Sequence, residues 1–594
     1  MAGSARLERK KHAKEVYIAV RSDGISGSGT KSNPLNGSTA AKLDALWADS
    51  SKIPAHAHIH LGPGVFKKDV SATWVMRPGW TIEGAGECST SFQLVGSMSG
   101  VNYGIALFYS DPNNTTDGTT ISRVTLDCNW PTLAFTSDQG GLGSHVVTDG
   151  ITTSGSPVLA TAGITANAGS GFMVSDISRT LTGSGIPSDT VILRNPRTTV
   201  ASGSNLAALP QSTINVISTA DFASTGSFQV EINNGGIQTI TYAGKTSTSF
   251  TRCSGGTGTI FFPGNVFTLT QIVMGNKSTL VPVNATATAA SVPVTIGGEK
   301  NCKANGVAIC GSHTRLRHVR CINSYGSMAN GQEAFALAIS APSGSGAERP
   351  STDNIIDSCL VELPSGNYGN PFLLAGGSYR KVHYMTNSVV KNCRAYGNHT
   401  GMRGGFTSGG VNFAGLKDCR IIDNDFIDCE AMAYIDTFSC QNIMVARNTG
   451  VRCVSGISFL QNASSDRGSW TKKNISIINN GIVLQNRLRS GQKTGINVSG
   501  STTTGITVTG NRIRYFANGL GTDSGVFGIH LSNYSNGTIT NNIVDSLASN
   551  LNELATNYMI RGNRTWSGAS LLEVGGLRHV PLTDSKTAAT ATPR

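Results

Sequence analysis

The sequence predicts an all-β fold in which parallel strands wind into a solenoid, and three observations support this prediction. First, an apolar residue followed three positions later by an asparagine recurs six times between Ile421 and Asn563, and successive asparagines are 24, 32, 31, 31 and 21 positions apart. A sustained period of this length indicates a repeat architecture. Second, each repeat contains short runs of alternating apolar and polar residues, rich in Ile, Val and Thr, which indicates strands. Third, glycine is abundant, at 71 residues, and charged residues make up only 14%, as expected for many strands joined by tight turns.

The repeated asparagines are expected to stack at one bend of successive coils. Each amide can donate to one neighbour and accept from the other, which satisfies a polar side chain that would otherwise be costly to bury. Cysteine fills the same slot upstream at Cys359 and Cys393, and Cys321 is a looser match, so the ladder is expected to reach nine steps. The ladder asparagines are Asn424, Asn448, Asn480, Asn511, Asn542 and Asn563.

The N-terminal region is predicted to contain one helix among strands. Residues 1–15 are basic and have no apolar core, so we expect no signal peptide. Val16–Val20 is a predicted strand, and a glycine-rich loop follows it. Ser38–Ser50 is a predicted helix with Ser38 as its N-cap. Its apolar face consists of Leu43, Leu46 and Trp47.

The order of these elements carries a family resemblance. A strand, a glycine-rich loop, a helix, "LGPGVF" (Leu61–Phe66) and "GWTIEGAG" (Gly79–Gly86) together resemble the start of the pectate-lyase-like family of right-handed parallel β-helix proteins. The resemblance implies that the helix caps the first coil, whose open edge any solenoid must cover. This fold hosts lyases, hydrolases, phage tailspikes and non-enzymes, so the resemblance implies a fold more than a reaction.

The middle of the chain differs from both ends. It is rich in Thr, Ser, Ala and Gly and lacks the repeated asparagine motif. It resembles β modules of phage tail fibres and bacterial surface proteins. We expect two nested modules, with Ser212–Gly256 inside a module formed by Thr152–Asn195 and Ser278–Gly298; a single decorated insertion is the alternative. The predicted organisation is a basic lead at 1–15, cap and first coils at 16–143, the inserted β module at 144–299, the main β-helix at 300–580 and a disordered tail at 581–594.

The twelve cysteines are predicted to be mainly buried free thiols, which behave as small apolar groups. Cys419, Cys429, Cys440 and Cys453 are spaced by ten, eleven and thirteen residues, which matches neither a zinc site nor a dense disulfide framework. One or two disulfides between adjacent coils are the alternative.

A polar groove is predicted along the second strand of each coil. The residues expected to point into the core are Val411, Ile435, Ile457, Ile496 and Ile529. Alternation along a strand then turns their neighbours outward on one face. These outward residues, predicted to bind an extended sugar chain, are Asn412, Tyr434, Ser458, Asn497 and His530. An ordinary solvated sheet face is the alternative.

The candidate catalytic residues come from the densest acidic cluster, which consists of Asp423, Asp425, Asp428 and Glu430, and from its surroundings. Glycoside hydrolysis needs two carboxylates that flank the scissile bond. A polysaccharide lyase needs a base and a cation, which Arg403 with His399, or Lys381 with His383, could supply. Ca²⁺ binding and a solvated turn beside Asn424 are alternative uses of the cluster. The predicted catalytic residues are Asp436, Glu430, Asp423 and Arg403.

Sequence motifs and the distribution of charge indicate which classes of partner the protein binds. The motifs of the polygalacturonase branch and a pectate-lyase calcium site are not evident, so pectin is not the expected substrate, and we predict no metal or cofactor. From Cys440 onward the chain has 15 Lys or Arg and 6 Asp or Glu, a net +9 of the total +12, which favours an acidic polysaccharide. Neither a nucleic-acid-binding motif nor an apolar run long enough to span a membrane is present.

Two functions follow as hypotheses. The first is a polysaccharide-binding protein that cleaves a surface or matrix polysaccharide, as a lyase or a glycoside hydrolase. The second is a non-catalytic virion tail fibre, tailspike or surface adhesin. Both imply an extracellular or virion-surface location. A homotrimer is an expectation from tailspikes, although the particle-binding head and C-terminal trimerisation domain usual in tailspikes are not evident.

Overall fold

The structure is a computed structural model of the 594-residue chain. For many strand residues, Asp436 and all strand residues between 548 and 578 except Asn563 among them, it describes the backbone alone. It describes residues 14–578 except 97–104, 111–115, 130–144, 162–171, 173–178, 233–236, 261–264, 269, 277–278, 280, 298–302, 327–333, 343–348, 364–368, 377–384, 398–405, 409–414, 430, 437–439, 454, 461–471, 486–492, 499–502, 517–525, 533, 545–547, 554–555 and 566–569.

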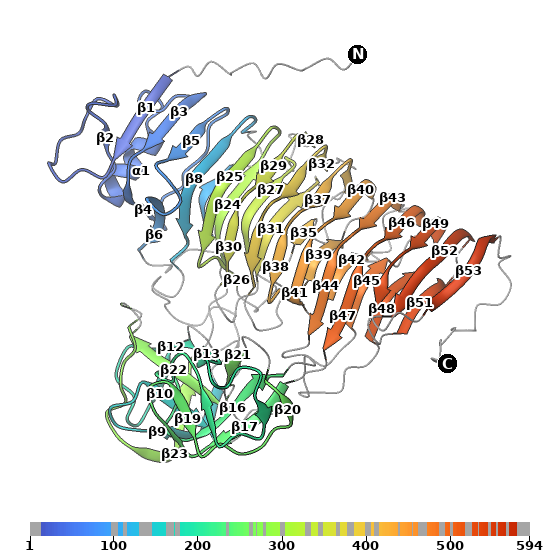
Figure 1. The fold of residues 1–594 in the computed structure, drawn as a ribbon. Helices are drawn as coiled ribbons and strands as arrows, with labels where there is room; N and C mark the ends of the chain where they lie inside the picture. The colour runs from blue at the N-terminus through green and yellow to red at the C-terminus, as the bar shows by residue number, and fades with distance from the viewer. Residues whose placement is uncertain are drawn as a thin grey trace.

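The described chain forms a right-handed parallel β-helix, which confirms the predicted fold class (Figure 1). Its strands pair almost entirely in parallel, coil upon coil, in one sheet of 27 strands and another of 11 strands, here called the second sheet. The second sheet consists of β7 (Ile105–Tyr109), β24 (Lys303–Cys310), β26 (Tyr325–Gly326), β27 (Ala334–Ser340), β31 (Gly369–Ala375), β35 (Phe406–Ser408), β39 (Ala431–Asp436), β42 (Ser455–Leu460), β45 (Lys493–Val498), β48 (Val526–Ser532) and β51 (Ala548–Glu553).

The first sheet runs the whole length of the β-helix and follows each coil around two bends. Its N-terminal strands are β1 (Lys14–Ala19), β2 (Leu35–Asn36), β3 (Ala57–Leu61), β4 (Gly64–Asp69), β5 (Thr81–Gly84), β6 (Thr90–Val95) and β8 (Thr120–Asp127). Its later strands are β25 (Arg315–Ile322), β28 (Ser351–Thr352), β29 (Ile355–Asp357), β30 (Leu360–Glu362), β32 (Met385–Thr386), β33 (Val389–Lys391), β34 (Arg394–Tyr396), β36 (Leu416–Lys417), β37 (Arg420–Ile422), β38 (Asp425–Ile427), β40 (Cys440–Ala446), β41 (Thr449–Cys453), β43 (Lys472–Ile478), β44 (Gly481–Gln485), β46 (Thr503–Thr509), β47 (Arg512–Phe516), β49 (Tyr534–Thr540), β50 (Ile543–Val544), β52 (Thr556–Thr565) and β53 (Ser570–Arg578).

The cap is the single helix of the described chain, α1 (Ala40–Ala48). Its N-cap is Thr39, whose hydroxyl accepts a hydrogen bond from the Lys42 amide at 3.3 Å, so the predicted N-cap at Ser38 is wrong by one residue. Both residues carry a hydroxyl, and only the backbone decides which one meets the first turn. The predicted apolar face is confirmed, because its members are buried: Leu43, Leu46 and Trp47.

The bends of the main β-helix are made by single residues in the left-handed backbone conformation. Asp423, Arg447 and Asn479 have φ values of 58°, 55° and 53°, and each directly precedes a ladder asparagine. Asn and Asp tolerate this conformation better than most residues, and glycine takes it freely, as Gly510 does with φ 67°. At each of these bends the residue directly before the asparagine makes the turn, and the asparagine behind it turns inward.

The predicted asparagine ladder is confirmed. Asn480 is representative: its Oδ1 accepts from the backbone amide and the Nδ2 of Asn448, each at 3.0 Å. Its own Nδ2 donates to the Val445 carbonyl at 3.0 Å and to Asn511 Oδ1 at 2.9 Å. Four bonds satisfy an amide that is 1% exposed. The chain of bonds is continuous from Asn424 to Asn563.

The ladder extends upstream through Cys393 and Cys359 but not through Cys321. Strand pairing sets Arg317 opposite Asp357 and Arg320 opposite Leu360, so the slot of Cys359 falls on Val319 in the preceding coil. The prediction for Cys321 was therefore wrong by two residues. The error has a physical reason, because residues two apart on a strand point into the same core and share the same apolar character.

Every described cysteine is a free thiol, and most are buried, which agrees with the prediction; Cys88 is exposed and Cys310 is half-buried. The irregular spacing of the cysteines along the chain follows from their positions at the bends of the coils. Several cysteines directly follow a left-handed bend residue and turn inward at the corners of the coils. These cysteines are Cys359, Cys393, Cys419, Cys429 and Cys453.

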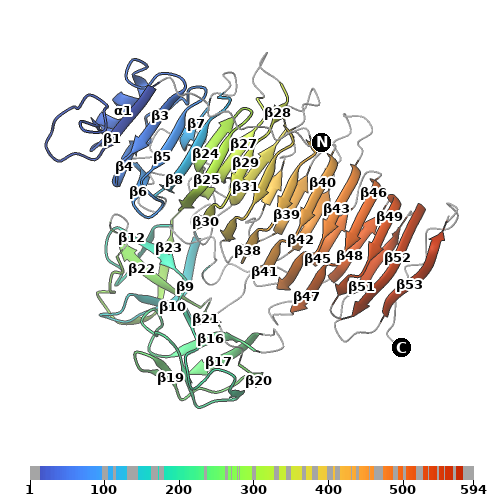
Figure 2. The same cartoon turned by 45° about the horizontal axis from the view of Figure 1, so that its top comes forward.

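The insertion lies beside the N-terminal half of the β-helix (Figures 1 and 2). One antiparallel sheet joins strands from both ends of the insertion: β9 (His145–Thr152), β10 (Val158–Thr161), β11 (Leu181–Gly183), β12 (Thr190–Arg194), β22 (Gln271–Asn276) and β23 (Ala289–Ile296). The strands between them form separate sheets: β13 (Arg197–Thr199), β14 (Ala208–Leu209), β15 (Thr213–Asn215), β16 (Gly226–Glu231), β17 (Ile237–Tyr242), β18 (Gly244–Lys245), β19 (Ser249–Thr251), β20 (Gly258–Thr259) and β21 (Asn265–Phe267).

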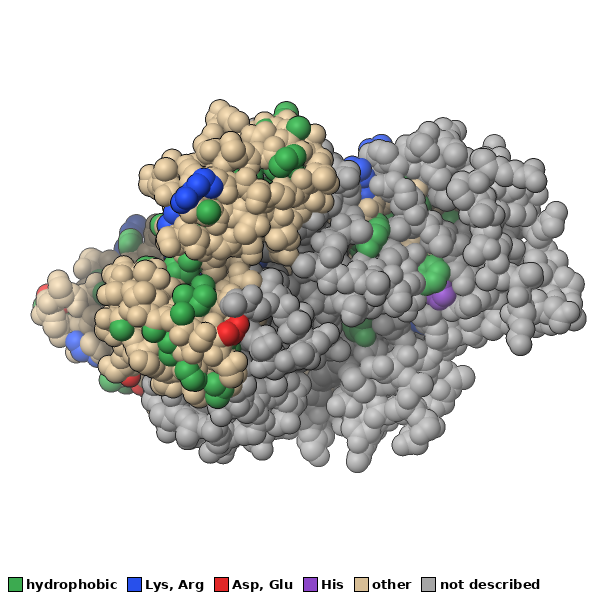
Figure 3. Space-filling view, turned by 90° about the horizontal axis from the view of Figure 1, so that it is seen from below, with side chains coloured by type: hydrophobic (Ala, Val, Ile, Leu, Met, Phe, Trp, Pro, Cys, Tyr) green, Lys and Arg blue, Asp and Glu red, His purple; other side chains and the backbone are tan. Residues whose placement is uncertain are grey.

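The two groups of strands have separate apolar cores. Phe222, Phe228 and Phe250 lie in the core formed by β13–β21, the inner group. Leu159 and Ile272 lie in the core formed by β9–β12, β22 and β23, the outer group. The described surface seen from below is mostly uncharged, with small apolar patches (Figure 3).

Candidate functional site

Four of the predicted groove residues lie in one row along the second sheet. Strand pairing places Tyr434 of β39 opposite Ser458 of β42, Ser458 opposite Asn497 of β45, and Asn497 opposite His530 of β48. These strands lie side by side in Figures 1 and 2. Neighbouring strands are about 4.8 Å apart, so the row presents one side chain per coil at that repeat. We call these four residues the polar row.

The alternation that the sequence predicted is present on these strands. The residues directly after the four members of the polar row are buried in the core: Ile435, Phe459, Val498 and Leu531. The residues directly before three of them, Ile457, Ile496 and Ile529, are also buried, and all seven side chains are no more than 2% exposed. Ile435, Ile457, Ile496 and Ile529 were predicted to point inward, and Val411, the fifth residue of that prediction, lies outside the described residues. Tyr434, Asn497 and His530 are half-buried, and Ser458 is buried. The polar row therefore lies outside the core but is partly covered.

Two atoms of the polar row are buried without a hydrogen-bond partner, namely Asn497 Oδ1 and His530 Nδ1. They belong to adjacent residues of the row. An unsatisfied buried polar atom costs about 1–3 kcal/mol, so each one in a folded protein needs an explanation. A ligand that supplies the missing partners is such an explanation. Asn497 Oδ1 can only accept a hydrogen bond, whereas His530 Nδ1 donates or accepts according to the ring tautomer.

The surface around the polar row offers apolar contacts as well. The Phe527 ring lies 5.5 Å from the His530 ring, centroid to centroid. Farther toward the N-terminus, the same line of the sheet becomes apolar, because Ala338 of β27 pairs with Leu373 of β31, and both pack with Phe335. One line of the second sheet thus carries apolar side chains at one end and hydrogen-bonding side chains at the other. This combination suits a ligand with hydroxyls and apolar ring faces.

The acidic cluster lies elsewhere. Asp423 sits at the bend between β37 and β38 of the first sheet, and Arg447 of the next coil holds both of its carboxylate oxygens at 2.8 Å. This ion pair lowers the pKa of Asp423 below its usual value. Asp425 pairs with Arg394 at 3.0 Å, and Asp428 pairs with Arg452 at 2.7 Å. Carboxylates held by arginine stay ionised at neutral pH, so Asp423 is unsuited to donate a proton.

The other candidate catalytic residues lie partly or wholly beyond the described structure. Asp436 ends strand β39 two residues after Tyr434, and only its backbone is described. The remaining predicted site residues are outside the described residues: Glu430, Arg403, Asn412, His399, Lys381 and His383. The structure therefore brings together the polar row, with Asp436 on one of its strands, and it places Asp423 on a different sheet.

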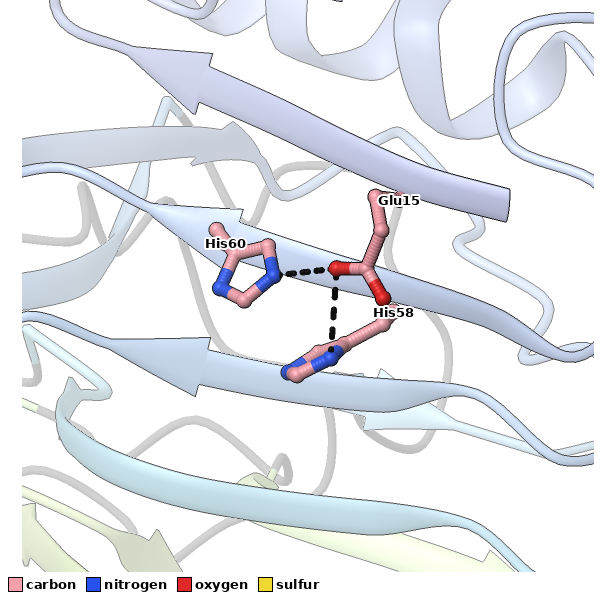
Figure 4. A group of neighbouring side chains, drawn as sticks. All are labelled: Glu15, His58 and His60. Atoms are coloured by element: carbon pink, nitrogen blue, oxygen red, sulfur yellow. Dashed lines mark hydrogen bonds and ion pairs between the residues drawn. The ribbon is translucent and has the colours of Figure 1, made fainter. Parts of the chain in front are cut away.

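Sequence reasoning missed one cluster of ligand-type side chains. Glu15 of β1 and both His58 and His60 of β3 lie together on the first two coils (Figure 4). The signal was present in the sequence, because "HIH" in a strand places its two histidines on one face. The sequence does not show the register between β1 and β3, whose paired residues Glu15 and His58 are 43 positions apart.

No helix in the described part of the chain is long and apolar enough to span a bilayer. No protein-family model and no curated protein sequence matches the chain.

Among solved structures, the chain is similar to the surface adhesin PfbA of Streptococcus pneumoniae, with 10% identity, 96% of each chain covered and a TM-score of 0.39. It is similar to the A-module of the mannuronan C-5 epimerase AlgE6 of Azotobacter vinelandii, with 10% identity over 89% of this chain and 94% of that chain and a TM-score of 0.37. It is also similar to the tailspike gp61 of Pseudomonas phage phi297, with 10% identity over 90% of this chain and 74% of that chain and a TM-score of 0.27. At such identities, the function has to be argued from the residues of the chain itself.

Proposed function

We propose that this protein binds an extended polysaccharide along the second sheet, with the polar row as its hydrogen-bonding contact. The observation that carries the proposal is the pair of unsatisfied buried atoms, Asn497 Oδ1 and His530 Nδ1, on adjacent strands of the row. A sugar hydroxyl can both donate and accept, so one glycan can satisfy both atoms once it displaces the atoms that cover them.

The regularity of the row favours a polymer over a small molecule. Each coil repeats the same position about 4.8 Å farther along the axis, and a linear glycan repeats its hydroxyls and ring faces along its own axis. Tyr434 and Phe527 supply aromatic faces beside the polar groups. The excess of positive charge after Cys440 favours an acidic polysaccharide through long-range attraction.

Cleavage of the bound glycan is the second part of the proposal. Asp436 is the proposed catalytic carboxylate, because it belongs to the same strand as Tyr434 of the row. Glu430 and Arg403 are its proposed partners, as a second carboxylate for hydrolysis or a cation for a lyase. Neither route requires a cofactor, and Ca²⁺ at carboxylate oxygens stays an alternative.

A non-catalytic attachment protein of a virion or cell surface is the second candidate. The observation that favours it is the insertion, whose two antiparallel groups of strands have cores separate from the β-helix core. Such modules suit a protein that binds or spaces at a surface. Both candidates place the protein outside the cell or on a virion, and a homotrimer is a proposal that sedimentation can test.

The test of binding is a panel of acidic and neutral polysaccharides, with Asn497→Leu and His530→Phe as site variants. Each variant removes an unsatisfied atom at similar volume, so we expect the thermal stability to hold or rise while glycan affinity falls. Thr507→Ala, an outward polar residue of β46 on the first sheet, is the matched control and should bind normally. If no glycan binds, or if both site variants bind as the wild type does, the proposed site is wrong.

The same panel separates cleavage from attachment. New reducing ends, with or without ultraviolet absorbance from an unsaturated product, establish cleavage, and Asp436→Asn should abolish it while preserving binding. Binding with neither product supports the attachment protein instead.

A further inference from the structure

The first two coils bring two histidines and a glutamate together on the outer surface of the β-helix. Glu15 of β1 pairs in register with His58 of β3, and His60 lies two residues farther along the same strand and face. Glu15 Oε2 is 2.5 Å from His60 Nε2 and 3.4 Å from His58 Nδ1. Figure 4 shows both rings turned toward this one carboxylate, which links two neighbouring coils.

Surrounding residues fix the orientation of both rings. The other nitrogen of His58, Nε2, lies 3.3 Å from Glu83 Oε2 on β5, and Arg123 Nη1 lies 3.3 Å from Glu83 Oε1. A proton on His58 Nε2 shared with Glu83 leaves the Nδ1 lone pair directed at Glu15. The His60 ring stacks on Tyr17 with centroids 4.5 Å apart and 15° between planes. In metal sites, a carboxylate often accepts a hydrogen bond from the second ring nitrogen of a ligating histidine and so fixes the orientation of the ring.

We propose that Glu15, His58 and His60 bind one divalent transition-metal ion of the zinc type, with water completing the coordination. Their ligand atoms, one from each residue, all lie within 4.8 Å of one another. Metal–ligand bonds of about 2.0–2.2 Å set tetrahedral ligands about 3.4 Å apart. The separation of Glu15 from His58 already has this value, and the Glu15–His60 contact has to open by about 0.9 Å.

Side-chain rotation can supply this opening. The side chain of Glu15 is 51% exposed, so it can move away from His60 while the His60 ring stays stacked on Tyr17. The ligand set also selects the ion. Imidazole nitrogen suits Zn²⁺, Cu²⁺ and Ni²⁺, whereas Ca²⁺ and Mg²⁺ prefer sites made wholly of oxygen.

The position gives the ion a structural consequence. It joins β1 of the first coil to β3 of the second, at the end of the β-helix that α1 covers. An ion that binds the folded state and not the unfolded chain stabilises the fold by mass action. The proposed site is therefore a metal clip on the N-terminal coils.

Zinc binding is measured by calorimetry and by metal analysis after dialysis, on the full chain carrying Cys88→Ser. This background removes the exposed thiol among the described cysteines, a competing zinc ligand. We expect one equivalent of Zn²⁺ and a higher melting temperature with Zn²⁺. The double variant His58→Gln/His60→Gln should lose both effects, and Glu83→Gln should weaken binding by about 10- to 100-fold.

His313→Ala is the matched control, because His313 Nδ1 also lies near a carboxylate, Asp353 Oδ2 at 3.5 Å, without a second histidine in a described cluster. It should bind as the background does. Co²⁺ spectra provide an independent readout: weak visible bands indicate nitrogen and oxygen ligands, whereas an intense near-ultraviolet band indicates thiolate. Circular dichroism without metal confirms that each variant is folded. The proposal is overturned by the absence of stoichiometric binding, by retained binding in the folded double variant, or by a thiolate band.

Discussion

Two stretches of the β-helix hold the same bend with different side chains. From Asn424 onward, the ladder position of each coil carries an asparagine, and the asparagines from Asn424 to Asn542 make hydrogen bonds to the coils on both sides. In the two preceding coils, the slot carries Cys359 and Cys393. Here the Cys359 amide donates to Cys393 Sγ at 3.5 Å, while the equivalent Asn448 amide donates to Asn480 Oδ1 at 3.0 Å.

The difference identifies what the slot requires. Where the two stretches meet, the Cys393 amide donates to Asn424 Oδ1 at 2.9 Å. The chain of hydrogen bonds therefore continues from the asparagine coils into the cysteine coils. The bend leaves a backbone amide that points along the axis and needs an acceptor from the next coil. Asparagine supplies a strong acceptor and two donors, whereas a thiol supplies a weak acceptor and a weak donor. The cysteine coils are therefore held more by apolar burial and the asparagine coils more by hydrogen bonds.

The largest expected effect comes from removing an amide within the asparagine coils. Asn480→Ala leaves the Asn448 backbone amide without its acceptor and takes a donor from the Val445 carbonyl. Asn448 Nδ2 loses one of its two acceptors and keeps the Ile421 carbonyl. Unpaired buried polar groups cost about 1–3 kcal/mol each, so we expect a loss of about 3–5 kcal/mol in the free energy of unfolding, measured by urea denaturation. Cys393→Ala is the matched variant in the cysteine coils. A loss for Cys393→Ala equal to that for Asn480→Ala would contradict the comparison.

The features that could be predicted from the sequence are those with a local period. Ladder, strand alternation and polar row all follow from residues two positions apart or one repeat apart. The ion pairs of the acidic cluster depend on coil length, which the ladder already contained: Asp423 and Arg447 are 24 residues apart, like Asn424 and Asn448. The cluster of Glu15, His58 and His60 could not be found this way, because the first coil has no ladder residue that gives its register.

Alkaline pH should weaken the β-helix through its buried thiols. Burial raises the pKa of Cys453 from 9.0 to about 12. A group whose folded pKa is raised contributes stability that is fully present below its unfolded pKa and is lost as pH rises from about 9 toward 12. Near pH 10.5 the loss for this thiol is about 2 kcal/mol. We expect urea midpoints of the wild type to fall more steeply above pH 9 than those of Cys453→Ala, and parallel curves would refute the argument.

A smaller effect is expected from extending the asparagine ladder by one coil. In Cys393→Asn, the new Oδ1 can accept from the Cys359 amide, and the new Nδ2 lies in position to donate to Asn424 Oδ1, as equivalent groups do at Asn480. We expect a gain of about 1 kcal/mol in urea denaturation, because a strong acceptor replaces sulfur. Asn424→Cys is the reverse change and should destabilise. Destabilisation by both would show that local packing, and not the acceptor, selects the residue.

The smallest effect is expected at the outer side of the same bends. In the cysteine coils, Asn392 Nδ2 donates to Asp357 Oδ1 at 3.0 Å, and in the asparagine coils Arg447 pairs with Asp423. Asp423 and Arg447 are both largely exposed, and exposed ion pairs contribute little to stability. Asp423→Asn should therefore leave the urea midpoint unchanged at moderate salt. It should also leave glycan binding and any cleavage unchanged, since the carboxylate is held by arginine on the first sheet and the polar row lies on the second. Loss of cleavage in a normally folded Asp423→Asn protein would return Asp423 to the catalytic site and move the proposed glycan path onto the first sheet.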